Sequence, residues 1–556
     1  MERTRARGRI LIDGSVTEGA TSRSLTPSAR QCGAWIALLA TILWLSLQGW
    51  GTFQVGSYQD DAVYLVLARS LAAGRYGLIN EPGPPPAPKY PFGFPLILAS
   101  LGSIGTEAPW ATVVPLVATL LNVTLLVWGW PLLSPTTGRW WGVAVAWLHG
   151  VSPLVISHTR IVMAEPVFFA FVLASLVLAE AVVLHPFAWW LAALLGVTLT
   201  GALFTRTIGI ALLAAITLRI GTDRRRIGCA PLAVASGASM VSLLAVLALT
   251  PIRVQHIWPS GYIAELSNNG AEGTGREPER ITDAPTARLS EYVFVGVRRM
   301  LLPLGGGEQE RQLVARLGLP VASSIIAAAI AGLLGLGAWY GFRQRALSPS
   351  VLLFEGFYVG ALMLWVGSTT RLLYPVQPFL AAQLLFGVRA LGGAVRRVWP
   401  RGGIRRPVEV AFVGAFLLAA SFAKSIHPEP SLDFTRDLRV GTTWLADHSP
   451  QEAVVMGRYP QSLYLYCGRQ TVPLTARTAE ELEHAFEERH VDYLLLGPAL
   501  AWRKGDTLGY DRLQSALLPA VAELTARGRL TQVFESAPQE LVRIYRVEPG
   551  ADPRRG

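Results

Sequence analysis

Residues 163–183 read MAEPVFFAFVLASLVLAEAVV, an apolar run whose only charged side chains are Glu165 and Glu180. A helix of this length crosses the roughly 30 Å of hydrocarbon in a bilayer. Ten further apolar runs surround it, so the chain is expected to cross the membrane about eleven times. The other runs are 34–54, 109–130, 140–157, 186–204, 207–220, 229–251, 319–341, 350–367, 371–390 and 408–425.

The composition agrees with a membrane protein. Of the 556 residues, 51% are hydrophobic and 16% are charged, whereas about a quarter of a soluble chain is charged. The three cysteines are too scattered for a disulfide framework and form no zinc pattern with the eight histidines. The composition therefore disfavours a soluble enzyme, a redox protein and a structural zinc protein.

The formal net charge of +11 would by itself suggest a nucleic acid or an anionic surface as the partner. Nineteen arginines, however, lie in the N-terminal tail and in loops that alternate crossings place on one side, which the positive-inside rule identifies as cytoplasmic. The basic charge is therefore a signal of topology, and no nucleic acid is expected. These residues are Arg3, Arg5, Arg7, Arg9, Arg23, Arg30, Arg139, Arg219, Arg224, Arg225, Arg226, Arg343, Arg345, Arg389, Arg396, Arg397, Arg401, Arg405 and Arg406.

Three regions follow from this pattern. Residues 1–33 form a basic cytoplasmic tail, and the run after it lacks a small-residue cleavage site, as in an uncleaved signal anchor. Residues 34–425 form the membrane part of a multi-pass cell-membrane protein. Residues 426–556, with 15 Lys+Arg and 18 Asp+Glu, form an extracytoplasmic domain.

A shorter apolar run, from Phe92 to Gly105, affects the whole topology. It is too short for a secure crossing and is expected to be re-entrant or interfacial. A full crossing there would invert every later loop and place the arginine clusters outside.

Beyond Ser425 the apolar runs shorten to strand length, with polar helices between them. We expect strands at 453–456, 491–496, 530–534 and 541–547, and helices at 478–489 and 511–528. Thr478 with Glu481 three residues later predicts a capping box at the first of these helices. The pattern indicates a soluble α/β domain.

The first outer loop carries an acidic pair, Asp60 and Asp61, at the start of a helical run that Gly74 ends. Such a pair is often only an acidic helix cap, since the helix dipole favours carboxylates there. Its position next to the first crossing also suits a base that accepts a proton from an attacking hydroxyl at the membrane face.

Further charged residues occur at the ends of apolar runs. Lys89, in a proline-rich stretch, is either a phosphate ligand or a lysine that reaches the membrane surface. Glu165 begins a crossing, where an acid is costly unless it faces a cavity or a partner. A structural ion pair between Glu165 and Arg160, five residues before it, is as reasonable an explanation as a catalytic role.

Two arginines, Arg206 and Arg371, lie in otherwise apolar turns that the topology places on the same side as Asp60. Neither has an acidic neighbour in sequence. A guanidinium group suits a pair of phosphate oxygens, although many arginines at helix ends are only interfacial anchors.

Together these residues resemble the type C glycosyltransferases that use a polyprenyl-phosphate sugar, in particular the protein O-mannosyltransferase-like family that includes the lipid A aminoarabinose transferase. The resemblance covers residues 34 to about 425. Asp61 stands where Glu is common, and Lys89-Tyr90-Pro91 where Lys-Pro-Pro is frequent. The matching residues are Asp60, Asp61, Ala62, Tyr64, Lys89, Pro91, Arg160, Glu165, Pro166, Arg371, Tyr374 and Pro375.

The resemblance implies a polytopic α-helical membrane protein of about eleven crossings with a C-terminal α/β domain. It implies that Asp60 deprotonates an acceptor hydroxyl, which displaces the polyprenyl phosphate from a hexose or pentose with inversion. Asp61 and Glu165 are further catalytic candidates, and no metal is required, although these two acids leave room for a divalent cation. The residues implied in substrate or phosphate binding are Tyr64, Lys89, Arg160, Arg206, Arg371 and Tyr374.

The expected partners are the lipid-linked donor, a lipid, glycan or protein acceptor, and membrane lipids. An alternative is a transporter or flippase of a lipid-linked substrate, with intramembrane charges along its pathway. That alternative favours inverted repeats with broken helices, which the two halves of the sequence do not display. A third class is a membrane-anchored binding or assembly protein whose outer domain carries the function.

Overall fold

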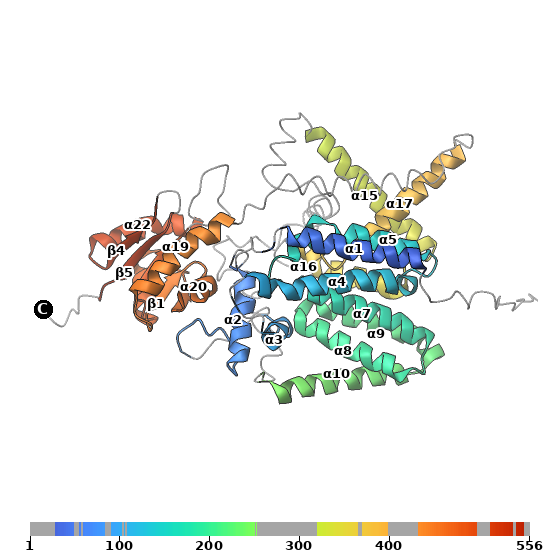
Figure 1. Cartoon of the computed structure of the whole chain (residues 1–556), viewed down its shortest axis with the longest axis horizontal. Coiled ribbons are helices and arrows are strands. Elements are labelled where there is room, and N and C mark those ends of the chain that lie inside the picture. Colours follow the sequence, from blue (N-terminus) through green and yellow to red (C-terminus); the bar gives the residue numbers. More distant parts are fainter. Residues whose placement is uncertain are drawn as a thin grey trace, which may run out of the picture.

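The structure is a computed structural model of the whole chain. It describes residues 28–48, 50, 55–56, 59–83, 90–102, 105, 108–250, 252, 320–364, 370–398, 432–497, 512–537 and 541–549. Within these residues a bundle of apolar helices joins a C-terminal α/β domain, and helix α2 stands between the two (Figure 1).

The bundle is built from the expected apolar runs, except that 408–425 lies outside the described residues. Among the described helices, four are long and apolar enough to cross a membrane by themselves: 29–47, 110–133, 165–184 and 230–249. The number of crossings stays a prediction. The helices are α1 (Ala29–Leu47), α4 (Ala108–Leu133), α5 (Arg139–Gly150), α6 (Pro153–His158), α7 (Glu165–Leu184), α8 (Trp189–Thr205), α9 (Ile210–Ile227), α10 (Ala230–Leu249), α15 (Pro320–Arg343), α16 (Pro349–Leu364) and α17 (Gln377–Val398).

Two expected runs differ locally from single helices. The run 140–157 is divided into α5 and α6 at Pro153, because the residue before a proline avoids the α region, and Ser152 has ψ 135°. The run 371–390 begins with the 3₁₀ turn η5 (Thr370–Leu373), and α17 starts only after Pro375. Both breaks bring side chains from connecting turns into the bundle.

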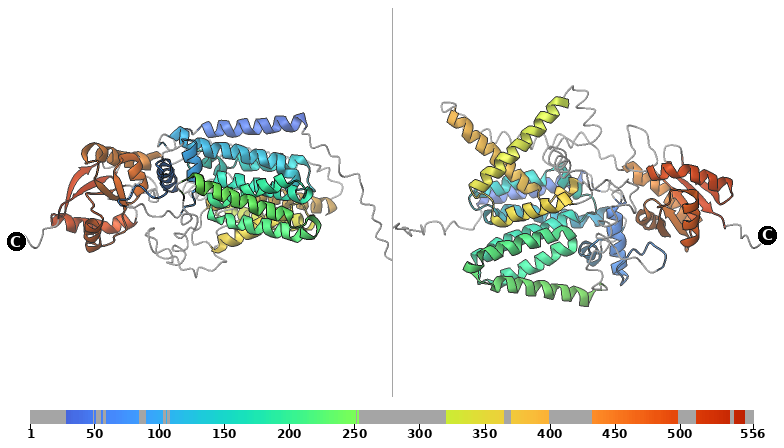
Figure 2. Two further views of the ribbon diagram at one scale, coloured as in Figure 1. Left: turned by 90° about the horizontal axis from the view of Figure 1, so that it is seen from below. Right: turned by 180° about the vertical axis from the view of Figure 1, so that it is seen from behind.

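The helices pack as a layer in which α7 lies between α4 and α8, and α8 packs on α10 (Figures 1 and 2). Helices α15 and α17 pack against each other and extend outward from the bundle. One continuous apolar core runs through the bundle, with Trp130, Phe168, Phe354 and Phe379 among its fully buried members.

A buried ion cluster closes the end of the bundle where α7 and α9 finish and α16 starts. Arg219 donates to both carboxylate oxygens of Glu180, at 3.1 and 3.0 Å, and also pairs with Asp223. The Ser350 hydroxyl donates to Glu180 Oε1 at 2.7 Å. Every oxygen of Glu180 is therefore hydrogen-bonded, which offsets the cost of burying its charge.

At the opposite end, α2 (Asp60–Ala72) and α3 (Gly93–Ser100) pack against each other. Helix α3 has eight residues, a rise of about 12 Å, which is less than half of the hydrocarbon thickness. Its first residue, Gly93, lies so close to the carbonyl of Phe204 that an added Cβ would approach the oxygen to 2.5 Å. A helix this short agrees with a run too short for a secure crossing, and the re-entrant or interfacial placement of 92–105 stays a prediction.

The C-terminal domain holds a five-stranded sheet in the order β2-β1-β3-β5-β4. Strand β1 is parallel to β2 and β3, whereas β5 is antiparallel to β3 and β4. The strands are β1 (Val454–Gly457), β2 (Gln470–Pro473), β3 (Tyr493–Leu496), β4 (Leu530–Glu535) and β5 (Arg543–Val547). The helices are α19 (Leu432–His448), α20 (Pro460–Cys467), α21 (Ala479–Glu488) and α22 (Arg512–Ala526).

This domain confirms the expected α/β class and the four expected strands. Helices α21 and α22 pack on one face of the sheet, and α19 and α20 pack on the other. Strands β1 and β3 are buried along their whole length, which explains their continuous apolar sequence. Thr478 caps α21 by accepting from the backbone N–H of Glu481.

Strand β2 and helix α20 were not expected from the sequence, yet they join the domain to the membrane part. The side-chain amide of Asn80 donates to the Thr471 carbonyl at 3.3 Å, and the Thr471 N–H donates to the Asn80 carbonyl at 2.6 Å. The Tyr466 hydroxyl donates to the carbonyl of Val55 at 2.7 Å. Leu465 belongs to the same apolar cluster as Tyr64 of α2.

Candidate functional site

The acidic pair occupies the first turn of α2, where the helix dipole favours ionised carboxylates. The two side chains lie in different surroundings. Asp61 is fully buried and accepts a hydrogen bond from the backbone N–H of Gly56 at 2.7 Å. Asp60 remains partly accessible, with 18% of its side chain exposed. Of the pair, Asp60 is the one that a substrate can reach.

Two side chains from distant turns hold Asp60. Arg371 Nη2 lies 2.5 Å from Asp60 Oδ2, and the Tyr90 hydroxyl donates to Asp60 Oδ1 at 2.5 Å. The guanidinium group of an arginine stays protonated in proteins. Arg371 is therefore a permanent cation beside the carboxylate.

Glu165 extends this arrangement on its other side. Its Oε1 atom lies 2.6 Å from Arg206 Nη1 and 3.8 Å from Arg371 Nε. Asp60, Arg371, Glu165 and Arg206 thus form a continuous row of alternating charges, called here the charge row. The two arginines without acidic neighbours in sequence are paired in space with the two acids.

Local structure explains how each member of the charge row reaches this end of the bundle. Glu165 begins α7, and Pro166 after it needs no hydrogen-bond partner in the first turn. Arg206 leaves the end of α8 in an extended conformation, with φ −149° and ψ 134°. Arg371 projects from the turn η5 that precedes α17. Three helix ends and one 3₁₀ turn therefore converge on one point.

A pocket of about 390 Å³, its open mouth included, lies beside the charge row. Arg206 lines the pocket directly. Its wall also contains Tyr64 of α2, Pro91, which follows Tyr90, and Leu372, which follows Arg371. The exposed fraction differs between the arginines and the acid that they share: 30% of the Arg371 side chain and 16% of that of Arg206 are exposed, against 2% for Glu165. The two cations therefore face the accessible side, with Glu165 behind them.

The remaining expected site residues occupy other positions. Arg160 donates to the carbonyl of Leu45 at 2.6 Å, and the cations next to Glu165 are Arg206 and Arg371. Tyr374 is fully buried, and its ring packs near the rings of His149 and His158. Lys89 lies outside the described residues.

Sequence reasoning missed two residues of the site. Tyr90 follows Lys89 in the sequence, and its hydrogen bond to Asp60 is a tertiary contact that has no local signal. His158 is buried at the end of α6, where its Nδ1 atom lies 2.7 Å from the Leu154 carbonyl oxygen. The motif that contains Arg160 and Glu165 also contains His158, and this shared motif was the only available signal.

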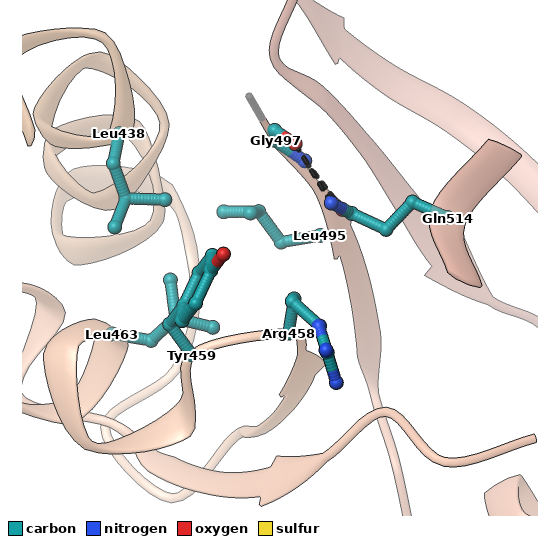
Figure 3. A pocket seen from close by; sticks show the side chains of 7 residues that line it. All are labelled: Leu438, Arg458, Tyr459, Leu463, Leu495, Gly497 and Gln514. Carbon is teal, nitrogen blue, oxygen red and sulfur yellow. Dashed lines mark hydrogen bonds between the residues drawn. The ribbon is translucent and has the colours of Figure 1, made fainter. Parts of the chain in front are cut away.

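A second, smaller pocket lies in the C-terminal domain, at the carboxyl ends of the parallel strands β1 and β3 (Figure 3). Arg458 and Tyr459 follow β1, and Gly497 follows β3. Gln514 bonds both the N–H and the carbonyl of Gly497 at 3.0 Å. Helix α20 follows β1, and α22 is the next described element after β3; these two helices pack on opposite faces of the sheet. Open α/β sheets often bind ligands at such a position.

No family model matches this sequence, and no curated protein matches it significantly. Solved structures do match it. The structure of ArnT from Cupriavidus metallidurans in the apo state has a TM-score of 0.52 at 13% identity, covering 93% of this chain and 98% of that chain. The Archaeoglobus fulgidus oligosaccharyltransferase complex with Zn and sulfate has a TM-score of 0.51 at 12% identity, covering 82% and 67%.

A structure of the archaeal oligosaccharyltransferase AglB from Archaeoglobus fulgidus, in complex with an inhibitory peptide and a dolichol-phosphate, is also similar. Its TM-score is 0.50 at 10% identity, covering 92% of this chain and 80% of that chain. The chain has the type C glycosyltransferase fold. This confirms the expected fold class, a polytopic helical membrane protein with a soluble domain.

Within this type C glycosyltransferase fold, the zinc in one neighbour raises the question of a metal here. Asp60 and Glu165 already pair with guanidinium groups, and Asp61 accepts from Gly56. In the part of the chain that the structure describes, no group of three His, Cys, Asp or Glu side chains is placed to hold a metal ion. The described acids therefore fit arginine partners better than a divalent cation.

Proposed function

We propose that this protein transfers a hexose or pentose from a polyprenyl-phosphate donor to an acceptor hydroxyl, with Asp60 as the general base. The observation that carries the proposal is the charge row at one end of an apolar bundle, in which the accessible carboxylate of Asp60 pairs with Arg371, and Glu165 joins Arg371 to Arg206. The known AglB complex with dolichol-phosphate supports this class of donor for the fold.

The proposed reaction needs a base and a cationic site for the leaving group. The acceptor oxygen attacks the anomeric carbon while its proton passes to Asp60. The bond from that carbon to the phosphate oxygen breaks, and its electron pair leaves with the polyprenyl phosphate. Attack opposite the leaving group inverts the anomeric centre. Because phosphate leaves as a stable anion, cations at its oxygens provide the stabilisation that is needed.

Arg371 and Arg206 are proposed as these cations, since they are the two cations of the charge row and both are partly exposed. Without donor, Arg371 neutralises Asp60. An arriving phosphate would compete with Asp60 for Arg371, and the released carboxylate would then be free to accept the proton. Glu165, which is buried behind both arginines, would orient them. Lys89 is proposed as a third cation.

The proposed orientation places the charge row at the outer face. The row and the C-terminal domain lie at the same end of the bundle, joined through α2 and α20 (Figure 1). The arginine-bearing ends of α9 and α15 lie at the other end, with the Glu180–Arg219 cluster. The positive-inside rule assigns that end to the cytoplasm.

The proposal is tested with purified protein in vesicles that contain radiolabelled polyprenyl-phosphate hexoses and pentoses, with membrane extract as the source of acceptor. We expect release of free polyprenyl phosphate together with sugar bound to acceptor, and no sugar transfer to acceptor when sugar nucleotides replace the lipid-linked donor. Movement of intact donor across the bilayer without cleavage would contradict the proposal and indicate a flippase instead.

A further inference from the structure

The turn before α2 has a backbone shape that almost only glycine adopts. Gly56 has φ +98°, and its N–H donates to Asp61 Oδ2 at 2.7 Å. Gln59, which precedes Asp60, also has a positive φ of 64°. The turn therefore directs one backbone N–H at the buried acid, and this contact fixes the first turn of the helix that carries Asp60.

A residue of the C-terminal domain fills the space beside this glycine. A Cβ atom added at Gly56 would lie 2.6 Å from Ser462 Oγ and 2.9 Å from Ser462 Cβ. Ser462 belongs to α20 and is 1% exposed. Its side chain therefore occupies the position where any larger residue at 56 would extend.

Three further contacts fix α20 on this turn. Tyr466, one helical turn after Ser462, donates to the carbonyl of Val55 at 2.7 Å. Leu465 packs in the apolar cluster that contains Tyr64 of α2. The Thr471 hydroxyl, in β2, donates to the carbonyl of Pro460 at 2.7 Å, while its backbone pairs with Asn80. Tyr466 thus joins α20 directly to the membrane part, and Pro460 is linked to it through Thr471.

We propose that α20 is a positioning element for catalysis. Ser462 packs against Gly56, and the N–H of Gly56 holds the carboxylate of Asp61. Asp61 in turn fixes the first turn of α2, which orients Asp60. This inference rests on the proposed role of Asp60 as the base. It gives the C-terminal domain a part in the chemical step that is separate from any acceptor binding. Leu463, the next residue of α20, lines the pocket of Figure 3, so that pocket and the Gly56 contact share one short helix.

The test compares Gly56→Ala with Gly74→Ala in the full-length protein. Gly74, at the other end of α2, also has a positive φ of 72°, but no atom lies within 4 Å of its added Cβ. Both variants place a side chain at a positive φ, so both carry backbone strain. We expect Gly56→Ala to lower kcat by about 100-fold, the scale of a 1 Å misplacement, with the donor KM unchanged. Gly74→Ala is expected to keep a normal kcat.

A second pair of variants tests the contact from the other side. Ser462→Gly removes the side chain that packs against Gly56, and we expect kcat to fall several-fold at constant donor KM. The double variant Gly56→Ala/Ser462→Gly has room for the new Cβ and should recover about tenfold in kcat over Gly56→Ala. A double variant no better than Gly56→Ala would overturn the positioning role of Ser462.

The outcome separates this inference from the proposed function. If Asp60→Asn abolishes transfer while Gly56→Ala and Ser462→Gly behave like Gly74→Ala, only the positioning role is wrong. If Asp60→Asn retains full transfer, the proposed base is wrong, whatever the α20 variants do. A positioning defect leaves Arg206 and Arg371 unchanged and therefore leaves donor affinity unchanged. A fall in donor affinity at constant kcat in Gly56→Ala would thus also contradict the positioning role.

Discussion

Arg371 and Asp60 form an ion pair of 2.5 Å, although one lies in a turn before α17 and the other begins α2. The same guanidinium also lies 3.8 Å from Glu165. One arginine therefore joins the accessible acid to the buried one. In the proposed mechanism this arginine has two successive partners, the base in the empty site and the phosphate when the donor is bound.

Substitution of Arg371 tests this double role. Arg371→Gln should lower kcat by about 10² to 10³-fold, as the loss of a transition-state donor does. Arg371→Lys keeps the charge but loses the planar fork that spans two acids, so an intermediate loss is expected. Steady-state kinetics with varied donor measure both. Arg389 is an exposed arginine of α17, and Arg389→Gln is the matched control. Equal losses of kcat in Arg371→Gln and Arg389→Gln would refute the double role of Arg371.

Glu165→Gln tests whether the buried acid orients the arginines. The substitution keeps the shape but removes the charge that balances Arg206. Two under-neutralised cations should bind donor several-fold more tightly in the ground state, while kcat falls about tenfold because the guanidinium groups lose their orientation. Donor binding is measured by titration, and turnover by phosphate release. Weaker donor binding in Glu165→Gln would count against this role.

The matched control for that change is Glu355→Gln. Glu355 is also buried in the bundle, where the side-chain amide of Gln383 donates to both of its oxygens at 3.1 and 3.0 Å. The described contacts of Glu355 include none with the charge row. Its glutamine variant is therefore expected to keep normal kinetics for donor and acceptor.

Much of the fold could be predicted from the sequence because membrane helices and short buried strands have strong patterns. The apolar run 163–183 became α7, and Thr478 caps α21. The expected capping box is only half formed, because the Glu481 side chain accepts from the Arg477 N–H and not from that of Thr478. Strand β2 was missed because Gln470-Thr471-Val472-Pro473 has one large apolar residue and a proline. It forms through pairing with β1 and Asn80, which are tertiary contacts with no local signal.

The site was predictable by residue type but not by pairing. Asp60, Glu165, Arg206 and Arg371 were all expected, because charges at the ends of apolar runs are costly without a purpose. Their order in the charge row depends on which helix ends converge, and spacing along the chain does not encode it. The contrast between Asp60 and Asp61 likewise depends on Gly56 and Ser462, residues from different regions.

The buried cluster at the opposite end gives a prediction about stability. Glu180→Ala leaves Arg219 buried without its bidentate partner and should destabilise the protein by about 3–5 kcal/mol. The double variant Glu180→Met/Arg219→Met removes both charges and should be destabilised less than Glu180→Ala. Unfolding in detergent by heat or denaturant measures the difference. A double variant less stable than Glu180→Ala would contradict the ion-pair explanation.

The proposed orientation predicts which surfaces are accessible from outside the cell. Thr136 lies in the exposed turn between α4 and α5, and Glu480 is exposed on α21. In a background with Cys32→Ser and Cys229→Ser, Glu480→Cys should react with a membrane-impermeant maleimide in intact cells. Thr136→Cys should react only after permeabilisation. The reverse pattern would invert the topology and place the charge row at the cytoplasmic face.

The most direct test of the central claim is turnover by Asp60→Asn with a polyprenyl-phosphate sugar at saturating concentration. The variant keeps the shape of the side chain and the Arg206–Glu165 pair, so donor binding should persist and can be measured in the same preparation. The account predicts normal membrane insertion, retained donor binding and loss of sugar transfer. Full transfer by folded, donor-bound Asp60→Asn would contradict it.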